Sequence, residues 1–235
     1  MYKFSNENND KVSVLLSVFN NENTILESLR SILNQTYRNL EVLVIDDGSS
    51  DDTYKKLKNI KDKRLQIFKN VKNIGLTKSL NILIAKANGN FIARQDADDI
   101  SDKHRIETQI MYLKKYNLDA CTTRAYIKNT TKVIPNFSYY LPQKLVVKIK
   151  NPFIHGTLLI SKSVLNTIGN YDEDFVYAQD YKLFTDLLKN DYKIGTIKKS
   201  MYFLNMTENI SSVKKNEQRY FADCVRKGIT PSKAF

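Results

Sequence analysis

Apolar and β-branched residues come in short, nearly continuous runs along the first half of the chain. Residues 12–18 and 40–45 form two such runs, and shorter ones cover 65–68 and 91–93. A continuous apolar run of this length is typical of a strand that is buried on both faces, as strands of parallel sheets are. The pattern therefore predicts a mostly parallel central sheet.

The segments between these runs carry apolar residues at helical spacing. Helices are expected around Ile25 to Leu33, over about 51–60, from Leu76 to Ala87, and around Ile106 to Leu113. Such β-α-β-α-β alternation predicts the α/β class, with an open, Rossmann-like sheet flanked by helices on both faces. In these sheets ligands bind beyond the carboxyl ends of the strands.

The pattern is less regular after about residue 117. We expect β-like stretches at 120–127, 131–134, 157–160, 192–197 and 200–204. A helix that carries Tyr181 and Phe184 follows a loop of acidic and aromatic residues. No repeat and no low-complexity linker divides the chain.

Composition narrows the class of protein. The 235 residues are 42% hydrophobic and 26% charged, as in a water-soluble globular domain. No apolar run approaches the roughly 20 residues that a membrane span needs, and the polar residues 1–10 have no signal-peptide core. Cys121 and Cys224 lie far apart and are expected to be unpaired thiols in a reducing compartment.

The formal net charge is +12, and half of it comes from residues 193–235. Anionic lipid headgroups, nucleotide substrates and nucleic acid are all compatible with this charge, as is a solvated lysine-rich surface. No nucleic-acid-reading motif is evident, so we expect no nucleic-acid partner. A dehydrogenase is also disfavoured, because no G-x-G-x-x-G follows a strand.

A cluster of carboxylates, Asp96-Ala97-Asp98-Asp99, follows the apolar run 91–93. Carboxylates this close together repel one another, and a divalent cation relieves the repulsion. Hard cations such as Mg²⁺ take oxygen ligands together with substrate phosphates. We therefore expect a metal-bound phosphate here, with Asp98 as a direct ligand. A second D-x-D pair, Asp172 and Asp174, follows a turn and is interpreted as a solvated loop.

Four further side chains, at three places in the chain, have a structural and a functional interpretation. Of Asp46 and Asp47, one organises a turn and the other could accept a hydrogen bond from a nucleobase. Asp180 is either a first-turn helix acid or a general base. His155 is either a satisfied structural histidine or a contact to an acceptor substrate.

Taken together, several motifs resemble those of family 2 glycosyltransferases with the GT-A fold. The resemblance covers about residues 11–210 and rests on the order and spacing of segments 12–20, 41–53, 73–81, 93–101 and 179–181. It implies transfer of a sugar from a nucleotide-sugar, with inversion at the anomeric carbon. It also implies a nucleotide-sugar-binding half (11–117), an acceptor-binding half (118–210) and a basic C-terminal segment (211–235).

The resemblance implies roles for individual residues. Those assigned to the nucleotide-sugar are Ser17, Phe19, Glu22, Asp47, Asn73, Lys78, Asn81, Asp96 and Ala97. Asp98, helped by Asp96, would hold Mn²⁺ or Mg²⁺ on the diphosphate. Asp180 would be the catalytic base, and His155 and Gln179 would lie at the acceptor.

This chain departs from the family pattern at three places. Ser17 stands where many relatives have Pro, and Gln179 where many have Glu. Leu204-Asn205-Met206 stands where relatives often carry Arg-x-His, which touches the diphosphate or the metal. A metal site with fewer ligands, or one completed from the basic C-terminal segment, is expected in consequence.

The expected function is a metal-dependent inverting glycosyltransferase that uses a UDP-hexose or UDP-N-acetylhexosamine. Its acceptor would be a glycan or a lipid-linked sugar of a bacterial surface polysaccharide, lipooligosaccharide or glycoprotein. Such an enzyme would work in the cytoplasm at the inner face of the membrane, where residues 211–235 could contact anionic lipid. The alternatives are a non-catalytic nucleotide-sugar- or glycan-binding module and a nucleotidyltransferase, although residues 18–23 lack the Gly-rich loop typical of the latter.

Overall fold

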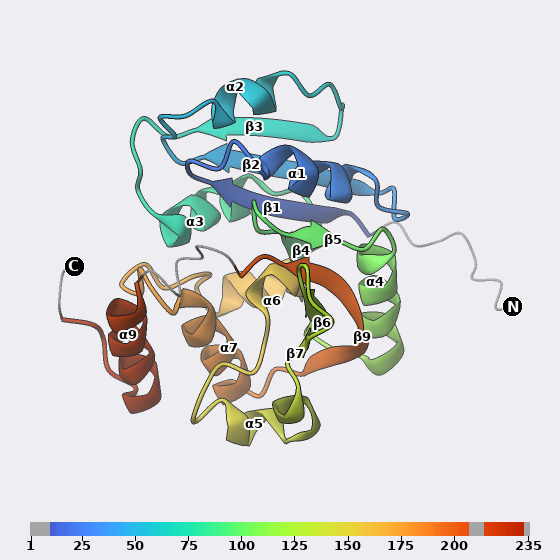
Figure 1. The fold of residues 1–235 in the computed structure, drawn as a ribbon. Coiled ribbons are helices and arrows are strands. Elements are labelled where there is room, and N and C mark those ends of the chain that lie inside the picture. Colours follow the sequence, from blue (N-terminus) through green and yellow to red (C-terminus); the bar gives the residue numbers. More distant parts are fainter. Residues whose placement is uncertain (1–9, 207–213, 233–235) are drawn as a thin grey trace, which may run out of the picture.

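The computed structural model describes residues 10–206 and 214–232. Over these residues the chain forms a nine-stranded sheet in the order β3-β2-β1-β4-β8-β6-β9-β5, with β7 paired to β6 (Figure 1). Helices cover both faces of this sheet, as the alternation of apolar runs and helical patterns predicted. The sheet is mixed, however, because its two halves are built differently.

The first half of the sheet is parallel. It contains β1 (Val12–Val18), β2 (Leu40–Asp46), β3 (Leu65–Lys69) and β4 (Phe91–Arg94). The register pairs Val18 with Asp46 and Asp46 with Lys69, so these strands end at one edge of the sheet. The polar residues that follow β1, β2 and β4 are thereby brought to the same edge.

The second half of the sheet introduces antiparallel pairs. Its strands are β5 (Ile100–Ser101), β6 (Ala120–Ile127), β7 (Val133–Ile134), β8 (Leu159–Ser161) and β9 (Ile194–Leu204). β8 lies antiparallel to both β4 and β6, whereas β9 lies parallel to β6. The runs 192–197 and 200–204, expected as separate stretches, form the single strand β9. The pairing register between β6 and β9 shifts near Arg124 of β6, and this irregularity lets β9 continue through its polar middle.

The helices pack into two apolar clusters, one on each face of the sheet. The helical elements are α1 (Ile25–Leu33), α2 (Thr53–Lys58), α3 (Leu76–Lys86), α4 (Arg105–Tyr116), η1 (Phe137–Tyr140), α5 (Gln143–Val146), η2 (His155–Thr157), α6 (Lys162–Thr167), α7 (Gln179–Lys189) and α9 (Lys215–Lys227). One cluster joins the sheet to α1, α2 and α4, and the other joins it to α3, α6, α7 and α9. Cys121 and Cys224 are buried free thiols, as expected.

The C-terminal stretch, which the sequence identified only by its positive charge, contains a helix that packs on the core. Phe221, Cys224 and Val225 of α9 are buried in the cluster that includes α7. Their spacing is that of one helical face, which the abundance of lysine and arginine obscured. Residues 1–9, 207–213 and 233–235, including parts of both predicted terminal segments, lie outside the described residues.

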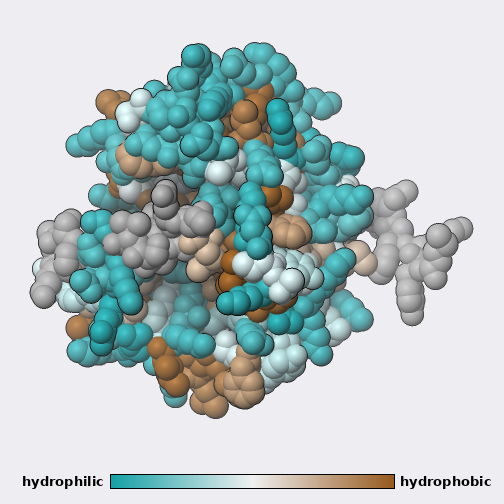
Figure 2. Space-filling model, in the orientation of Figure 1, coloured by the Kyte–Doolittle hydropathy of each residue, from teal (hydrophilic) through white to brown (hydrophobic). Residues whose placement is uncertain are grey.

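The surface is mostly polar. Figure 2 shows a largely hydrophilic face, with apolar side chains gathered at its lower end, where α5 lies in Figure 1. Within 10–206 and 214–232, no helix has the combination of length and apolar character that crossing a bilayer requires.

A buried acid on β2 contributes to stability. Glu41 accepts hydrogen bonds from Lys11 Nζ (2.7 Å), Ser13 Oγ (2.6 Å) and the Asn88 backbone N–H (2.6 Å). Although burial raises it, these hydrogen bonds lower the pKa of Glu41 from 4.5 to about 2. The ionised carboxylate therefore stabilises the fold above about pH 4.5, and this contribution is lost as the pH falls through about 2.

We expect Glu41→Gln to lower the free energy of unfolding by about 1–3 kcal/mol at pH 7. The difference from the wild type should shrink as the pH is lowered from 5 towards 2, because the wild-type carboxylate then protonates. Urea unfolding at several pH values measures this, with Asp52→Asn at an exposed ion pair as the control. A loss that is equal at pH 7 and pH 3 would contradict the role of the charge.

Candidate functional site

The site lies at the edge where β1, β2 and β4 end. The acidic turn after β4 is fixed to the start of α1 by two hydroxyl groups. Ser28 Oγ donates to the Asp96 carbonyl (2.7 Å), and Thr24 Oγ1 donates to the Ala97 carbonyl (3.1 Å). Gln95, which is fully buried, donates from Nε2 to the Asp99 carbonyl (2.9 Å). The main chain of residues 96–99 is therefore held rigidly by its neighbours.

Asp96 lies between buried cationic and aromatic groups. Its Oδ1 pairs with Nη2 of the buried Arg94 at 2.5 Å, and its backbone N–H donates to the Tyr202 hydroxyl at 3.1 Å. The side chain remains 31% exposed. Gly156 lies directly against it, because a methyl group at that position would come within 2.5 Å of Asp96 Oδ2. Asp96 thus keeps access to a ligand while its orientation is set by Arg94.

Asp98 and Asp99 have raised pKa values. Burial and the Asp96 charge raise the pKa of Asp98 to about 6, despite the opposing charge of Lys128. Burial and the charges of Asp96 and Asp98 raise the pKa of Asp99 to about 8. Asp99 is 1% exposed and accepts a hydrogen bond from the Asn205 backbone N–H at 2.6 Å, so it faces inward. Although Arg94 pairs with Asp96 and Lys128 acts on Asp98, the carboxylates still repel one another, and a bound cation would relieve this repulsion.

The donor atoms present fit part of a metal site. Asp96 and Asp98 supply carboxylate oxygens, which Mg²⁺ and Mn²⁺ take together with phosphate oxygens and water. Over the part of the chain that the structure describes, no three His, Cys, Asp or Glu side chains converge to hold an ion. Any metal bound at Asp98 would need further oxygen ligands, such as water or substrate phosphate.

The segment that replaces the expected Arg-x-His motif lies at this cluster. Leu204 ends β9, and Asn205 follows it with its backbone N–H on Asp99. The Asn205 backbone N–H therefore contacts the acidic cluster, close to where the side chains of an Arg-x-His motif would lie.

Asp180 lies at the start of α7, on the other side of the site. Its Oδ2 accepts a hydrogen bond from Asn151 Nδ2 at 2.7 Å. Burial raises its pKa, the hydrogen bonds from Tyr181 and Asn151 oppose this, and the charge of Asp96 adds to the rise. Ala178, two residues earlier, has a left-handed conformation (φ 53°), which turns the chain into the helix. Asp180 and the acidic cluster are therefore close enough to interact electrostatically.

His155 also belongs to this site. Its Nε2 is 2.7 Å from the Tyr171 hydroxyl, and burial together with the Arg94 charge holds its pKa well below 6.5. Burial raises the pKa of Tyr171, and the charges of Asp180 and Asp96 contribute. His155 is therefore bonded to a tyrosine that lies within electrostatic range of both Asp180 and Asp96. Gln179, the other predicted acceptor residue, is 9% exposed at the first position of α7.

Two residues assigned to the nucleotide-sugar have clear structural contacts. Asp47 accepts hydrogen bonds from Asn70 Nδ2 (2.7 Å) and from the backbone N–H groups of Ile74 (3.0 Å) and Gly75 (2.9 Å). It thereby shapes the loop that leads into α3. Asn81 Nδ2 donates to the Tyr171 carbonyl, and its Oδ1 accepts from the Tyr171 N–H. A direct contact of either residue with a nucleotide stays a prediction.

Five other residues that were assigned to the nucleotide-sugar are exposed or partly buried. Phe19 is 47% exposed, and Asn73 and Lys78 are also exposed. Glu22 is partly buried and lies 3.5 Å from Lys56 Nζ, whereas Ser17 is partly buried near the end of β1. Asp46 is fully buried, and its carboxylate oxygens have no hydrogen-bond partner among the described residues.

Several side chains at the site were not identified from the sequence as site residues. They are Arg94, Arg105, Asn151, Gly156, Tyr171 and Tyr202. Arg105 is fully buried and donates to the carbonyls of Gly156 (2.8 Å) and Arg94 (2.9 Å), which joins α4 to the acidic turn. A signal for Arg94 was present in the sequence, because this cation directly follows the apolar run 91–93 and lies two residues before Asp96.

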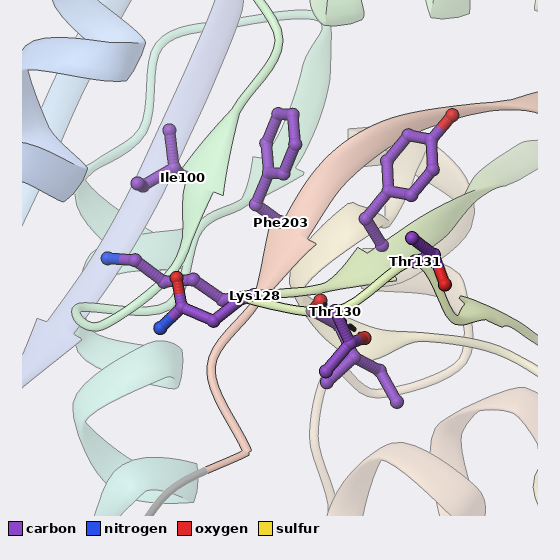
Figure 3. A pocket seen from close by; sticks show the side chains of 8 residues that line it. Ile100, Lys128, Thr130, Thr131 and Phe203 are labelled. Atoms are coloured by element: carbon purple, nitrogen blue, oxygen red, sulfur yellow. Dashed lines mark hydrogen bonds between the residues drawn. The ribbon is translucent and has the colours of Figure 1, made fainter.

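A shallow groove of about 670 Å³ borders the acidic cluster. It is lined by Ile100, Tyr126, Ile127, Lys128, Asn129, Thr130, Thr131 and Phe203 (Figure 3). The rings of Tyr126 and Phe203 stack with centroids 5.6 Å apart, and each residue is 39% exposed. Aromatic faces beside hydroxyl and amide groups suit a ligand with both apolar and polar faces, such as a sugar ring.

Gly156→Ala should disturb the site directly, because the added methyl group would overlap the Asp96 carboxylate and the Tyr202 hydroxyl. We expect a loss of about 1–3 kcal/mol in the free energy of unfolding, as for other overpacked buried positions, and weaker donor binding. Urea unfolding and calorimetric donor titration measure the two effects. Gly169→Ala is a control with open space around the new methyl group, although its φ of 87° adds backbone strain. Unchanged donor affinity in Gly156→Ala would contradict this packing.

The comparisons with known proteins agree with this geometry. The sequence profile of Glycosyl transferase family 2 matches residues 13–169. An uncharacterized glycosyltransferase of Haemophilus influenzae is 32% identical over 90% of this chain and 71% of its own length. An Escherichia coli protein named UDP-Glc:alpha-D-GlcNAc-diphosphoundecaprenol beta-1,3-glucosyltransferase WfgD is 33% identical over 77% of this chain and 70% of its own length.

Solved structures share the fold. Staphylococcus aureus TarS 1-349 in complex with UDP-GlcNAc has a TM-score of 0.73 at 22% identity and covers 85% of this chain. The mannosyltransferase PcManGT of Pyrobaculum calidifontis, in complex with GDP-Man and Mn²⁺, has a TM-score of 0.75 at 19% identity and covers 94%. This chain spans 59% and 65% of those chains. The profile match and the similarity to the curated relatives show that the chain belongs to glycosyl transferase family 2.

Proposed function

We propose that this glycosyltransferase moves a hexose or N-acetylhexosamine from a UDP-sugar to a glycan or lipid-linked acceptor, with inversion. The observation that carries the proposal is that the acidic cluster and Asp180 lie close enough in one site to interact electrostatically. Burial raises the pKa of Asp180, and the Asp96 charge adds to the rise. The acidic cluster would hold the leaving diphosphate through a divalent cation, and Asp180 would accept the acceptor's proton.

On the donor side, the exposed edge formed by Phe19, Asn73 and Lys78 would hold the nucleotide, with Ser17 and Glu22 beside it. Asp98, assisted by Asp96, would hold Mn²⁺ or Mg²⁺, and Ala97 would lie at the donor sugar. When bound, the metal would neutralise negative charge on the nucleoside diphosphate as it leaves. Burial and the Asp96 charge, which raise the pKa of Asp98, support this assignment, because a bound cation would offset the repulsion between the two carboxylates.

On the acceptor side, Asp180 would act as the general base. The acceptor hydroxyl would lose its proton to Asp180 while its oxygen forms a bond to the anomeric carbon, and the bond from that carbon to the diphosphate breaks. His155 and Gln179 would orient the acceptor. The groove lined by Tyr126 and Phe203 would hold an acceptor sugar ring close to the acidic cluster.

The relatives support the choice of substrates. The name of the Escherichia coli relative specifies UDP-Glc and a diphosphoundecaprenol-linked acceptor, and the TarS structure contains UDP-GlcNAc. PcManGT is shown with GDP-Man and Mn²⁺, which supports a metal although its nucleotide differs. We therefore propose action in the cytoplasm at the inner membrane face, with a divalent metal. The family match disfavours a nucleotidyltransferase.

A non-catalytic nucleotide-sugar-binding module is the second candidate, favoured by Leu204-Asn205-Met206 in place of Arg-x-His. Calorimetric binding of UDP- and GDP-sugars, with Mn²⁺ or with EDTA, tests both candidates when it is combined with a transfer assay on a lipid-linked acceptor. Metal-dependent binding of one UDP-sugar and its transfer would support the proposal. Binding without hydrolysis or transfer would favour the module, and no binding would reject both.

A further inference from the structure

Residues 137–149 present an unusual concentration of exposed apolar side chains. Phe137 is 73% exposed, Tyr140 68%, Leu145 59% and Ile149 72%, and Leu141 is also exposed. We name these five residues the α5 surface. α5 lies at the lower end of the fold in Figure 1, and apolar side chains gather at the lower end of the same view in Figure 2. A group of this kind on a surface that is otherwise polar marks a contact site for another apolar body.

The helical geometry explains how this surface arises. Backbone hydrogen bonds from Val147 to Gln143 and from Lys150 to Val146 extend the helical turns of α5 to residue 150. Val146 and Val147 are buried against the protein, whereas Leu145 and Ile149, four residues apart, remain exposed on the outer side of these turns. The segment is therefore apolar on two faces, although a surface helix usually needs only one apolar face.

Positive charge surrounds the α5 surface. Lys144, Lys148 and Lys150 are interleaved with its apolar residues. Arg226 of α9 donates to the Ile149 carbonyl (3.2 Å), which brings the basic end of α9 beside the same segment. Lys144 pairs with Asp191, whereas Lys148 and Lys150 have no ion pair within the described residues. Apolar and aromatic side chains flanked by lysine are the features of segments that lie in the interface of an anionic membrane.

The α5 surface continues directly into the site. The Val147 carbonyl accepts a hydrogen bond from the Tyr181 hydroxyl (2.6 Å), and Asn151 donates to Asp180. A body that binds Leu145 and Ile149 would therefore lie on the segment that leads to Asn151 and His155. The α5 surface and Asp180 are thus connected through residues 147–151.

We propose that the α5 surface docks on an anionic lipid bilayer. Phe137, Tyr140, Leu145 and Ile149 enter the boundary between headgroups and acyl chains, while Lys148 and Lys150 contact lipid phosphates. The lysines keep their charged ends in the headgroup layer while the apolar side chains lose contact with water. This inference extends the membrane location in the proposed function, but vesicle binding does not depend on sugar transfer.

Co-sedimentation of the full chain with vesicles tests the proposal, using phosphatidylglycerol–phosphatidylcholine vesicles and vesicles of phosphatidylcholine alone. We expect binding to the anionic vesicles, weakened at least about 10-fold by Leu145→Ser with Ile149→Ser. Lys148→Gln with Lys150→Gln should weaken it by about 5-fold for each charge removed, and only with anionic lipid. The matched control is Met111→Ser with Tyr116→Ser, which removes two exposed apolar side chains from α4.

Two further measurements separate this proposal from its rivals. Transfer to a short water-soluble acceptor should be unchanged in the Leu145/Ile149 variant, because this acceptor does not require the membrane. Vesicle binding is measured without sugar transfer, so its result stands even if the proposed activity is not found. Sedimentation velocity tests whether a second copy covers the α5 surface instead. A dimer that becomes monomeric in the Leu145/Ile149 variant would overturn the proposal. Equal vesicle binding by the wild type and this variant would also overturn it.

Discussion

Replacing Asp180 by Asn is expected to lower the rate of sugar transfer by about 10²–10⁴-fold, the usual contribution of a positioned general base. Asparagine has nearly the same shape, so the contact with Asn151 can be retained in part, but the amide cannot take a proton. Donor affinity should change less than the rate, because Asp180 is assigned to the acceptor and not to the nucleotide-sugar. Initial rates with saturating donor and calorimetric donor titration measure the two quantities.

The pH dependence provides a second test of Asp180. Burial and the charge of Asp96 raise its pKa above the ordinary value of 3.8. Since only the ionised form accepts a proton, activity should fall on the acid side at a higher pH than for an ordinary aspartate. Asp186→Asn on the same helix removes an acid that pairs with Lys182 and serves as the control. A rate in Asp180→Asn close to that of the wild type would reject Asp180 as the base.

Asp98→Asn is expected to weaken metal-dependent donor binding by at least about 10–100-fold, since even an outer partner of a metal typically contributes that much. Asp98 supplies a direct ligand in the proposed site, and an amide oxygen is a weaker ligand than a carboxylate. Donor titrations with Mn²⁺ and with EDTA measure the effect. The double variant Asp172→Asn with Asp174→Asn alters the second D-x-D pair, which lies in a loop before α7, and should bind donor normally.

The same substitution should not weaken the fold. The folded-state pKa of Asp98 is raised to about 6, so its ionisation above that pH opposes folding. Removing the charge is therefore expected to raise the free energy of unfolding by about 1 kcal/mol at pH 7.5. Higher stability together with lost donor binding would identify Asp98 as a functional residue. Lost binding with lower stability would instead indicate a structural role.

The first half of the fold followed from local patterns. The strand runs 12–18 and 40–45 correspond to β1 and β2 almost residue for residue. The helical spacing around Ile25 and Leu76 corresponds to α1 and α3. Burial on both faces makes such strands apolar throughout, and this property is visible in a single sequence. The second half was harder, because its strands are short, mixed in direction and interrupted by polar residues.

The positive charge of the C-terminal segment and the exposed apolar residues of the α5 surface lie in different parts of the chain. The net positive charge pointed to residues 211–235, but α9 within that stretch buries Phe221, Cys224 and Val225 in the core. The segment 137–149 contains five exposed apolar residues, the α5 surface. Leu145 and Val146 are adjacent in sequence and similar in hydrophobicity, so only the packed structure distinguishes the outward side chain from the inward one.

By itself, the sequence determined the class of fold, the acidic cluster at the end of β4 and the motifs of the family, because periodicity and short motifs are local properties. The tertiary structure decided which distant groups meet there. Tyr202 contacts Asp96 from 106 positions away, and Asn151 reaches Asp180 from 29 positions away. Such contacts depend on the order of strands in the sheet, and the burial that shifts the pKa values of Asp98 and Asp180 exists only when those strands and helices have packed together.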